Sequence, residues 1–385
     1  MSTKFLLIDD DVQSGDAPAE RYAEKLTLVS KGALTVDTYR PQSIDKVLAR
    51  IVEEKPDGLL VDVAFTNALT EEHVSIAYDG MALAQQIRTS QTRGLRQSIG
   101  ANLPEFPLVR LSKLDVIREF IKGDTTGEDL FDEKVDKADV IEHAESIVPR
   151  LISLAADYPR VSEYAALETK TEDAVAHLLG VPEEFLARLD ARTLLGLRRV
   201  DAPAHVLSRY VIGSLLGRPG PLIDEALVAV RFGIDTPSSE NWPAVLEHLK
   251  LAAYQGVFAD GYRRWWMPLV LDWWATTIDD KQAPFRLAAA DRVRMIQEKT
   301  KIGHLRSIAE NPDSPGTKFW QRCIVSKLPV DPAFGFPLMA EWGQETWHDV
   351  DYLCQEEAMR DPRNTRLAPT EQSRLARLRK GNNPG

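Results

Sequence analysis

Carboxylates within the first 62 residues have the types and spacing of a metal and phosphoryl site. Asp9 and Asp10 follow an apolar run at 5–8, and Asp62 lies in a second apolar run at 59–63. Converging carboxylates raise one another's pKa, and a divalent cation relieves the repulsion. Hard oxygen ligands with spare water positions suit Mg²⁺. A carboxylate beside Mg²⁺ can attack phosphorus and form an aspartyl phosphate.

Two further residues could neutralise the oxygens of such a phosphoryl group. Ser112 follows an apolar run at 107–111, and Lys134 lies within the run at 130–135. A transferred phosphoryl group needs cationic and hydrogen-bonding partners. We therefore expect Ser112 and Lys134 beside Asp62.

The elements that must position these residues alternate between strand and helix patterns. Short apolar runs bounded by turn residues predict strands at 5–8, 34–39, 59–63, 107–111 and 130–135. Helical spacing predicts helices at 18–29, 43–54, 79–88, 115–122 and 138–154. This alternation predicts an α/β doubly wound, five-stranded parallel sheet with helices on both faces. The functional crevice of such a sheet lies at the carboxyl ends of its strands.

Residues 1–154 resemble the receiver domain of response regulators in two-component signalling. The segments that carry the resemblance are LLIDD at 6–10, DGLLVD at 57–62, FPLVRLS at 106–112 and LFDEK at 130–134. DGMALAQQIR at 79–88 resembles the helix that follows the phosphorylated strand. The resemblance implies a flavodoxin-like fold and a phosphoacceptor role.

It also implies a role for each site residue. Asp62 would accept the phosphoryl group, and Phe131 would be the switch aromatic. Ser112 would be the switch hydroxyl, and Lys134 would contact the phosphate. Mg²⁺ would be held by Asp9, Asp10, Asp62 and the backbone carbonyl of Ala64.

The chain departs from the family pattern at three places. Lys113 stands where a small residue is usual, and Val135 replaces the usual proline. The loop at 65–78 is longer than usual and lacks the customary proline. These departures bear on dephosphorylation and partner fit. The alternative is a fold of this shape that is never phosphorylated, but all the acids and a lysine are present.

The chain beyond residue 154 has a mainly helical pattern. Predicted helices cover 172–179, 182–197, 204–216, 223–232, 242–254, 262–277 and 288–310. We expect a helical output or interaction domain at 155–360 and a polar, Arg-rich, flexible tail at 361–385. No P-loop, nucleophile elbow or paired-histidine motif indicates an enzyme in this half.

The densest feature of this half is RRWWMPLVLDWW at 263–274. Its aromatic residues fall at helical spacing, with Pro268 as a candidate kink. The favoured interpretation is core packing, because aromatic side chains bury the most surface. The alternative is a partner-binding surface made by Arg263, Arg264, Trp265, Trp266, Trp273 and Trp274.

A helix-turn-helix at 177–189, with Gly180 at the turn, is a weaker alternative to a plain helical hairpin. The formal charge of −11 argues against nucleic acid as a partner of the whole surface, but leaves a local basic patch open. The cysteines, Cys323 and Cys354, lack metal-site spacing and suggest a reducing compartment.

The sequence thus predicts a response-regulator-like protein that receives a phosphoryl group from a histidine kinase or phosphotransfer protein. The helical region would bind a protein target or change the oligomeric state. The alternatives are a DNA-binding transcriptional regulator and a phosphate sink in a multi-component kinase system, such as a defence system. No apolar run approaches the ~20 residues that span a bilayer, so we expect a cytoplasmic protein without membrane contact.

Overall fold

The computed structural model describes residues 2–12, 18–65, 76–91, 103–113, 126–341, 343–361 and 365–381. Within it, the chain forms two compact units, each described below by itself. Unit 1 comprises Met1–Ala187, Ala191–Gly213 and Gln255–Tyr262, and unit 2 comprises the remainder. Because the helix that crosses residue 154 continues to Ala165, the predicted domain boundary falls inside unit 1.

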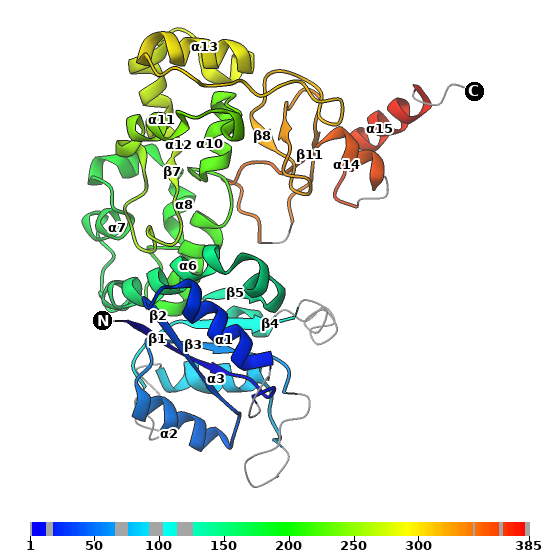
Figure 1. Cartoon of the computed structure of the whole chain (residues 1–385). Coiled ribbons are helices and arrows are strands. Elements are labelled where there is room, and N and C mark those ends of the chain that lie inside the picture. The colour runs from blue at the N-terminus through cyan, green and yellow to red at the C-terminus, as the bar shows by residue number, and fades with distance from the viewer. Residues whose placement is uncertain are drawn as a thin grey trace. The chain divides into compact units, whose positions relative to one another are not determined.

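Unit 1 contains a five-stranded, all-parallel sheet with the strand order β2-β1-β3-β4-β5 (Figure 1). This is the flavodoxin-like order of a doubly wound sheet. The strands are β1 (Thr3–Ile8), β2 (Leu34–Tyr39), β3 (Gly58–Val61), β4 (Leu108–Ser112) and β5 (Glu133–Asp136). The predicted fold class is confirmed.

Helices cover both faces of this sheet. On one face, α2 (Ile44–Glu54) and α3 (Gly80–Gln91) share an apolar core with alternate residues of β1 and β3, such as Leu6 and Leu59. On the other face, α1 (Pro18–Val29) packs against α6 (Lys137–Ala165). Successive side chains of a strand point to opposite faces of the sheet. Because helices cover both faces, the central strands are apolar throughout. The predicted helix at 115–122 lies outside the described residues.

Helix α6 is longer than the 138–154 that the sequence predicts. It continues to Ala165 through Pro149 and Pro159, with a non-helical residue at His143. Tyr158, Val161 and Tyr164 are buried at three-residue spacing, so packing holds the last turns despite the missing proline donors.

The rest of unit 1 is a helical extension of the sheet domain. Its elements are α7 (Glu172–Leu179), a 3₁₀ helix at Glu183–Arg188, α8 (Ala191–Leu195) and α9 (Ala204–Arg209). A single helix predicted at 182–197 is wrong, because the chain forms a 3₁₀ turn and then the five-residue α8. The segment after Gly180 therefore lacks the long second helix that a helix-turn-helix needs to enter a DNA groove.

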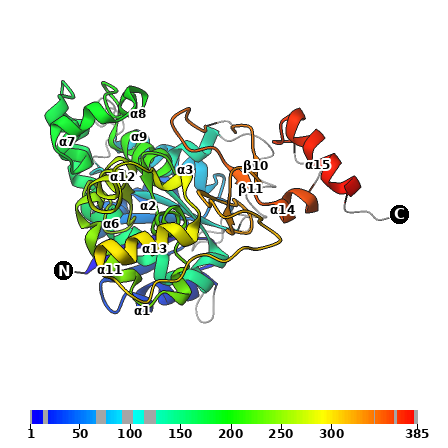
Figure 2. The same ribbon diagram turned by 90° about the horizontal axis from the view of Figure 1, so that it is seen from above.

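Unit 2 is mainly helical, with pairs of two-residue strands. Its helices are α10 (Glu225–Phe232), α11 (Trp242–His248), α12 (Met267–Trp273), α13 (Ala289–Thr300), α14 (Gln355–Arg360) and α15 (Pro369–Gly381). Its strand pairs are β6 (Leu222–Ile223) with β7 (Trp265–Trp266), β8 (Gln321–Arg322) with β9 (Pro329–Val330), and β10 (Phe336–Pro337) with β11 (Tyr352–Leu353). Figure 2 shows α14 and α15 beside β10 and β11.

The predicted aromatic helix at 262–277 is wrong in its first part. Trp265 and Trp266 form β7, and α12 begins only at Met267, with Pro268 in its first turn. Proline is favoured there because its missing donor is not needed at a helix start. Pro268 therefore starts a helix and does not kink one.

The partner surface proposed for this segment is also wrong in most of its residues. Trp265 and Trp274 are buried in the core of unit 2, Trp273 packs against that core, and Trp266 is also buried. Arg263 is exposed, whereas the Nε of Arg264 donates to the carbonyl of Leu216 at 2.7 Å. The favoured interpretation, core packing, is confirmed.

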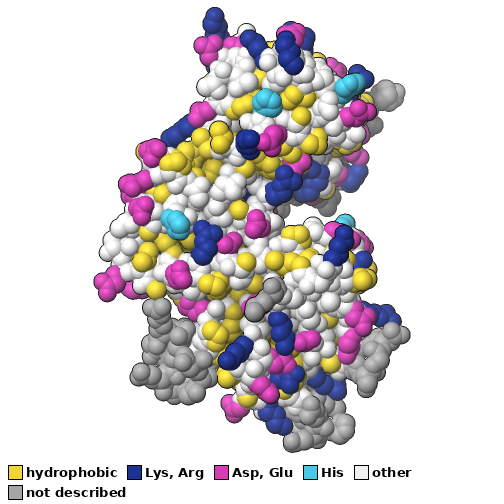
Figure 3. Space-filling view, turned by 60° about the vertical axis from the view of Figure 1, so that its left-hand side comes forward, with side chains coloured by type: hydrophobic (Ala, Val, Ile, Leu, Met, Phe, Trp, Pro, Cys, Tyr) yellow, Lys and Arg dark blue, Asp and Glu magenta, His cyan; other side chains and the backbone are white. Residues whose placement is uncertain are grey.

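The predicted flexible tail contains the helix α15 instead. Leu375 is buried and Leu378 packs against the same small core, because residues three apart share one side of a helix. On the face drawn in Figure 3, basic and acidic side chains are interspersed. None of the described helices is long and apolar enough to cross a membrane.

Candidate phosphoacceptor site

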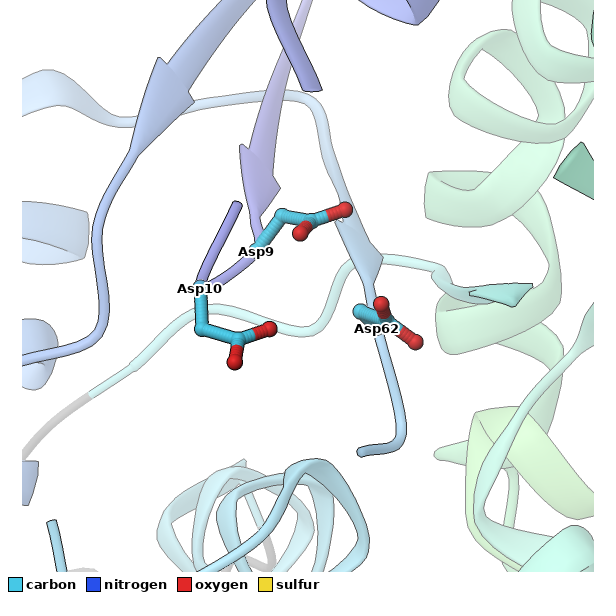
Figure 4. A group of neighbouring side chains, drawn as sticks. All are labelled: Asp9, Asp10 and Asp62. Carbon is cyan, nitrogen blue, oxygen red and sulfur yellow. The ribbon is translucent and has the colours of Figure 1, made fainter. Parts of the chain in front are cut away.

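The three predicted acids come together at the carboxyl end of the sheet. Asp9 and Asp10 directly follow β1, and Asp62 directly follows the neighbouring β3. One carboxylate oxygen from each lies within 4.8 Å of the others, and all three residues are buried (Figure 4). The pairing of parallel strands thus places three acids from two distant segments around one small volume.

Donors from three directions hold the carboxylate of Asp62. The hydroxyl of Ser112 donates to Asp62 Oδ1 at 2.6 Å, and the backbone amide of Val63 lies 2.7 Å from the same oxygen. The Val63 amide also lies 2.9 Å from Ser112 Oγ. The ammonium of Lys137 donates to Asp62 Oδ2 at 2.5 Å. Ser112 therefore lies where the sequence places it.

The lysine that contacts Asp62 is Lys137, so the prediction that Lys134 lies beside Asp62 is wrong. Lys134 lies within β5 with an exposed side chain, whereas Lys137 is buried at the first residue of α6. The Nζ of Lys137 lies 2.8 Å from Asp9 Oδ2, in addition to its bond with Asp62. It also lies 5.6 Å from the ring centre of Tyr22 on α1.

The reason for this shift lies at the other end of β5. The side chain of Asp132 is fully buried. Its Oδ2 pairs with the guanidinium of Arg88 at 2.6 Å and accepts a hydrogen bond from the amide of Leu108 at 2.8 Å. This anchor lies between a 3₁₀ helix at Thr126–Leu130 and β5, which starts at Glu133. The strand therefore starts three residues later than the predicted 130–135 and ends one residue later, at Asp136, so the lysine that directly follows it is Lys137.

Burial and neighbouring charges shift the pKa values of Asp9 and Lys137. Burial raises the pKa of Asp9 to about 6; Lys137 opposes this change and Asp62 adds to it. Burial lowers the pKa of Lys137, but the carboxylates of Asp9 and Asp62 outweigh burial and keep its pKa above the ordinary value. Lys137 is therefore a permanent cation at neutral pH, and it neutralises one of the acids around it.

The donor set fits a hard divalent cation. The three acids offer carboxylate oxygens within 4.8 Å of one another, which is the ligand chemistry of Mg²⁺. Asp9 Oδ2 is buried and has no hydrogen bond of good geometry, although it forms the ion pair with Lys137. A cation beside Asp9 would satisfy this oxygen. Ala64 is buried two residues after Asp62, and the role of its carbonyl stays a prediction.

Gly80 is a positioning residue that the sequence alone does not reveal. It begins α3, and a Cβ at this residue would lie 1.8 Å from the backbone oxygen of Asp62. The amide of Gly80 donates to the carbonyl of Val63 at 2.9 Å. Any larger residue would displace the backbone that carries the acceptor carboxylate. The sequence places this glycine in the segment that resembles the helix after the phosphorylated strand, but it does not reveal the contact between Gly80 and the backbone of Asp62.

The other predicted residues lie near the site or away from it. Phe131 is buried in the core between the sheet, α2 and α3. Lys113 is exposed directly after β4, and Val135 is buried within β5. Most of the long loop at 65–78 lies outside the described residues.

Comparisons with known proteins add little to this geometry. A scan against protein-family models and a search of curated proteins find no match. Among solved structures, the chain is similar to a candidate response regulator from Chloroflexus aurantiacus J-10-fl, with 21% identity, 38% of this chain and 98% of that chain covered, and a TM-score of 0.23. It is also similar to a mutant of RitR, with 12% identity, 55% and 83% coverage, and a TM-score of 0.30.

A third solved structure, the lysine decarboxylase LdcF of Francisella novicida, has 12% identity, 61% and 29% coverage, and a TM-score of 0.23. At TM-scores this low, none of these likenesses decides a function. The strand order and the acid cluster of this chain themselves fit a receiver domain.

Proposed function

We propose that this chain is a response-regulator-like signalling protein, not an enzyme, that accepts a phosphoryl group on Asp62. The donor would be a phosphohistidine of a histidine kinase or of a phosphotransfer protein. The observation that carries the proposal is the environment of Asp62, whose carboxylate is held between Ser112 and Lys137 beside Asp9 and Asp10.

The residues around Asp62 match the needs of phosphoryl transfer. A carboxylate oxygen of Asp62 attacks phosphorus, the P–O bond forms, and the P–N bond to the donor histidine breaks. The ammonium of Lys137 and the hydroxyl of Ser112 already bond the attacking carboxylate, so they lie within reach of the new phosphoryl oxygens. Preorganised donors of this kind stabilise the charge that develops on those oxygens.

Mg²⁺, when bound by Asp9, Asp10, Asp62 and the carbonyl of Ala64, would neutralise phosphoryl oxygens that the chain's donors do not reach. Asp9 is buried against the site and ionises with a pKa of about 6, so it presents a carboxylate to a cation at neutral pH.

A specific observation favours a phosphate sink as the second candidate. The resemblance places the switch aromatic three residues before the lysine, and in this structure that position is Lys134. Phe131, the aromatic residue expected to switch, is enclosed in the core. A receiver without a mobile aromatic residue could accept and lose phosphoryl groups without signalling through that route.

A small phosphodonor such as acetyl phosphate, with Mg²⁺, tests the acceptor role. Intact-protein mass should rise by one phosphoryl group in the wild type and in Lys134→Ala, which is the matched control. Asp62→Asn should not be modified, and Lys137→Ala should be modified far more slowly. Modification that persists in Asp62→Asn, or an equal loss in both lysine variants, would refute the proposal.

Limited proteolysis with and without the phosphodonor separates relay from sink. A relay predicts that phosphorylation changes cleavage in the helical extension of unit 1 or in unit 2. A sink predicts the same cleavage pattern in both states, together with turnover of the phosphoryl group.

A further inference from the structure

The chain has two cysteines, and the structure brings them together in unit 2. Cys323 directly follows β8, and Cys354 directly follows β11. Both are fully buried in one small core that also contains Val330, Phe336 and Leu353. The only thiols of a long chain thus meet at one point, although they come from different strand pairs.

The backbone sets the two residues in neighbouring register. Cys323 forms a parallel bridge with Tyr352, and the amide of Ile324 donates to the carbonyl of Tyr352 at 2.9 Å. Cys354 comes two residues after Tyr352, and residues two apart in an extended segment point to the same side. Cys323 and Cys354 are therefore diagonal neighbours. Diagonal neighbours have Cα atoms about 7–8 Å apart, whereas disulfides join Cα atoms about 4.4–6.8 Å apart, so a small approach of the two segments closes the bond.

The two thiols contact each other and differ in character. The hydrogen bond from Cys354 lowers the pKa of Cys323, although burial opposes this change. The same contact and burial raise the pKa of Cys354. The hydroxyl of Ser326 lies 3.4 Å from Cys354 Sγ. Two contacting thiols can share one proton, so one sulfur can react as a thiolate while its neighbour resolves the oxidised intermediate.

A short, partly exposed turn lies next to Cys354. The turn that follows Cys323 contains Val325 and Lys327, both exposed, with the half-buried Ser326 between them. The core beneath it is small and is joined by strands of two residues. Segments with few buried apolar contacts open locally at low free-energy cost, which would admit a small oxidant.

We propose that Cys323 and Cys354 form an oxidisable dithiol that closes into an intramolecular disulfide when the protein meets hydrogen peroxide. The Cys323 thiolate attacks one peroxide oxygen, the O–O bond breaks, and the departing hydroxide takes up a proton to become water. The resulting sulfenic acid is attacked by the Cys354 sulfur. The S–O bond breaks, and a second water leaves with the Cys354 proton. The two sulfurs lose two electrons, which reduce the peroxide to two waters.

Intact mass after peroxide treatment, denaturation and alkylation tests this site in the full chain. The wild type should lose two hydrogens and take up no alkylating reagent. Cys323→Ser and Cys354→Ser should form no intramolecular disulfide. Cys354→Ser should instead accumulate a sulfenic acid at Cys323 that dimedone traps. Trapping at Cys354 in the Cys323→Ser variant at an equal rate would overturn the assigned roles of the two sulfurs.

A second measurement removes dependence on peroxide access. The full chain is unfolded, refolded in a mixture of reduced and oxidised glutathione, and then alkylated. If the fold favours the bond, the Cys323–Cys354 disulfide should be the main product at a redox ratio that leaves the unfolded chain reduced. Two free thiols in both experiments would overturn the proposal.

Discussion

Replacing Asp9 by asparagine should stabilise the metal-free protein at neutral pH, although it removes an ion pair with Lys137. Burial is the main reason why the pKa of Asp9 rises from 3.8 to about 6. The raised pKa means that the folded protein tolerates the ionised carboxylate less well than the unfolded chain does. Each pKa unit corresponds to about 1.4 kcal/mol. The shift of about two units therefore amounts to a penalty of about 3 kcal/mol at pH 7, which the neutral amide avoids.

The penalty has a defined pH window. A carboxyl group whose pKa is higher in the folded state destabilises that state fully above the folded pKa, here about 6. The destabilisation is relieved as the pH falls towards the unfolded value of 3.8. The advantage of Asp9→Asn over the wild type should be about 3 kcal/mol at pH 7, roughly half of that at pH 5, and about a fifth of it near pH 4.

Denaturant unfolding in EDTA measures this difference, and the chain offers an internal control. All 8 tryptophans lie in unit 2, so their fluorescence follows that unit. Hydrogen exchange of the β1 and β3 amides follows unit 1. We expect higher protection in unit 1 of the variant, and an unchanged tryptophan transition if the units unfold separately. Mg²⁺ should stabilise the wild type and leave the variant nearly unaffected.

The reasoning would be refuted by a metal-free Asp9→Asn protein that is less stable than the wild type at pH 7. In that case the ion pair with Lys137 would outweigh the burial of the Asp9 carboxylate. A stability gain that does not change between pH 7 and pH 4 would equally refute it, because the gain would then have a cause other than ionisation.

Three other expectations follow from the same contacts. Mg²⁺ affinity, measured by calorimetry, should fall about tenfold per pH unit below pH 6, because Asp9 then holds a proton that the metal must displace. Arg88→Met should cost about 3–5 kcal/mol in urea unfolding, since it leaves Asp132 buried and unpaired, and the added change Asp132→Leu should recover part of the loss. Gly80→Ala should lower both stability and phosphorylation rate, because its Cβ would collide with the backbone of Asp62.

The acid cluster could be predicted because its information is local. Asp9 follows one short apolar run and Asp62 lies near the end of another, and parallel strands bring such ends to one edge. The same logic placed Ser112 correctly at the end of β4. Burial and pKa could not be predicted, because they depend on the chain that covers the site, including Lys137 at the start of α6.

The lysine could not be chosen correctly because its position depends on a contact between distant residues. Leu130 and Phe131 are apolar and read as the start of a strand. Leu130 instead ends a 3₁₀ helix, and Phe131 lies in the connection before β5, beside Asp132, which pairs with Arg88, 44 residues earlier. In the same way, the spacing around Trp265 satisfies a helical pattern, but pairing of β7 with β6 takes that residue into a strand. Tertiary contacts decide such cases against local periodicity.

The three-residue shift also changes how a phosphorylated Asp62 could be read. Lys137 is the first residue of α6, whose start is capped by the side chain of Asp136. Any movement of the Lys137 ammonium from Asp9 towards a phosphoryl oxygen therefore acts on the first turn of this helix. Tyr158, further along α6, bonds both Arg88 and Asp132. A signal from Asp62 would thus enter a helix that runs through unit 1, and an aromatic residue on β5 would not be needed to carry it.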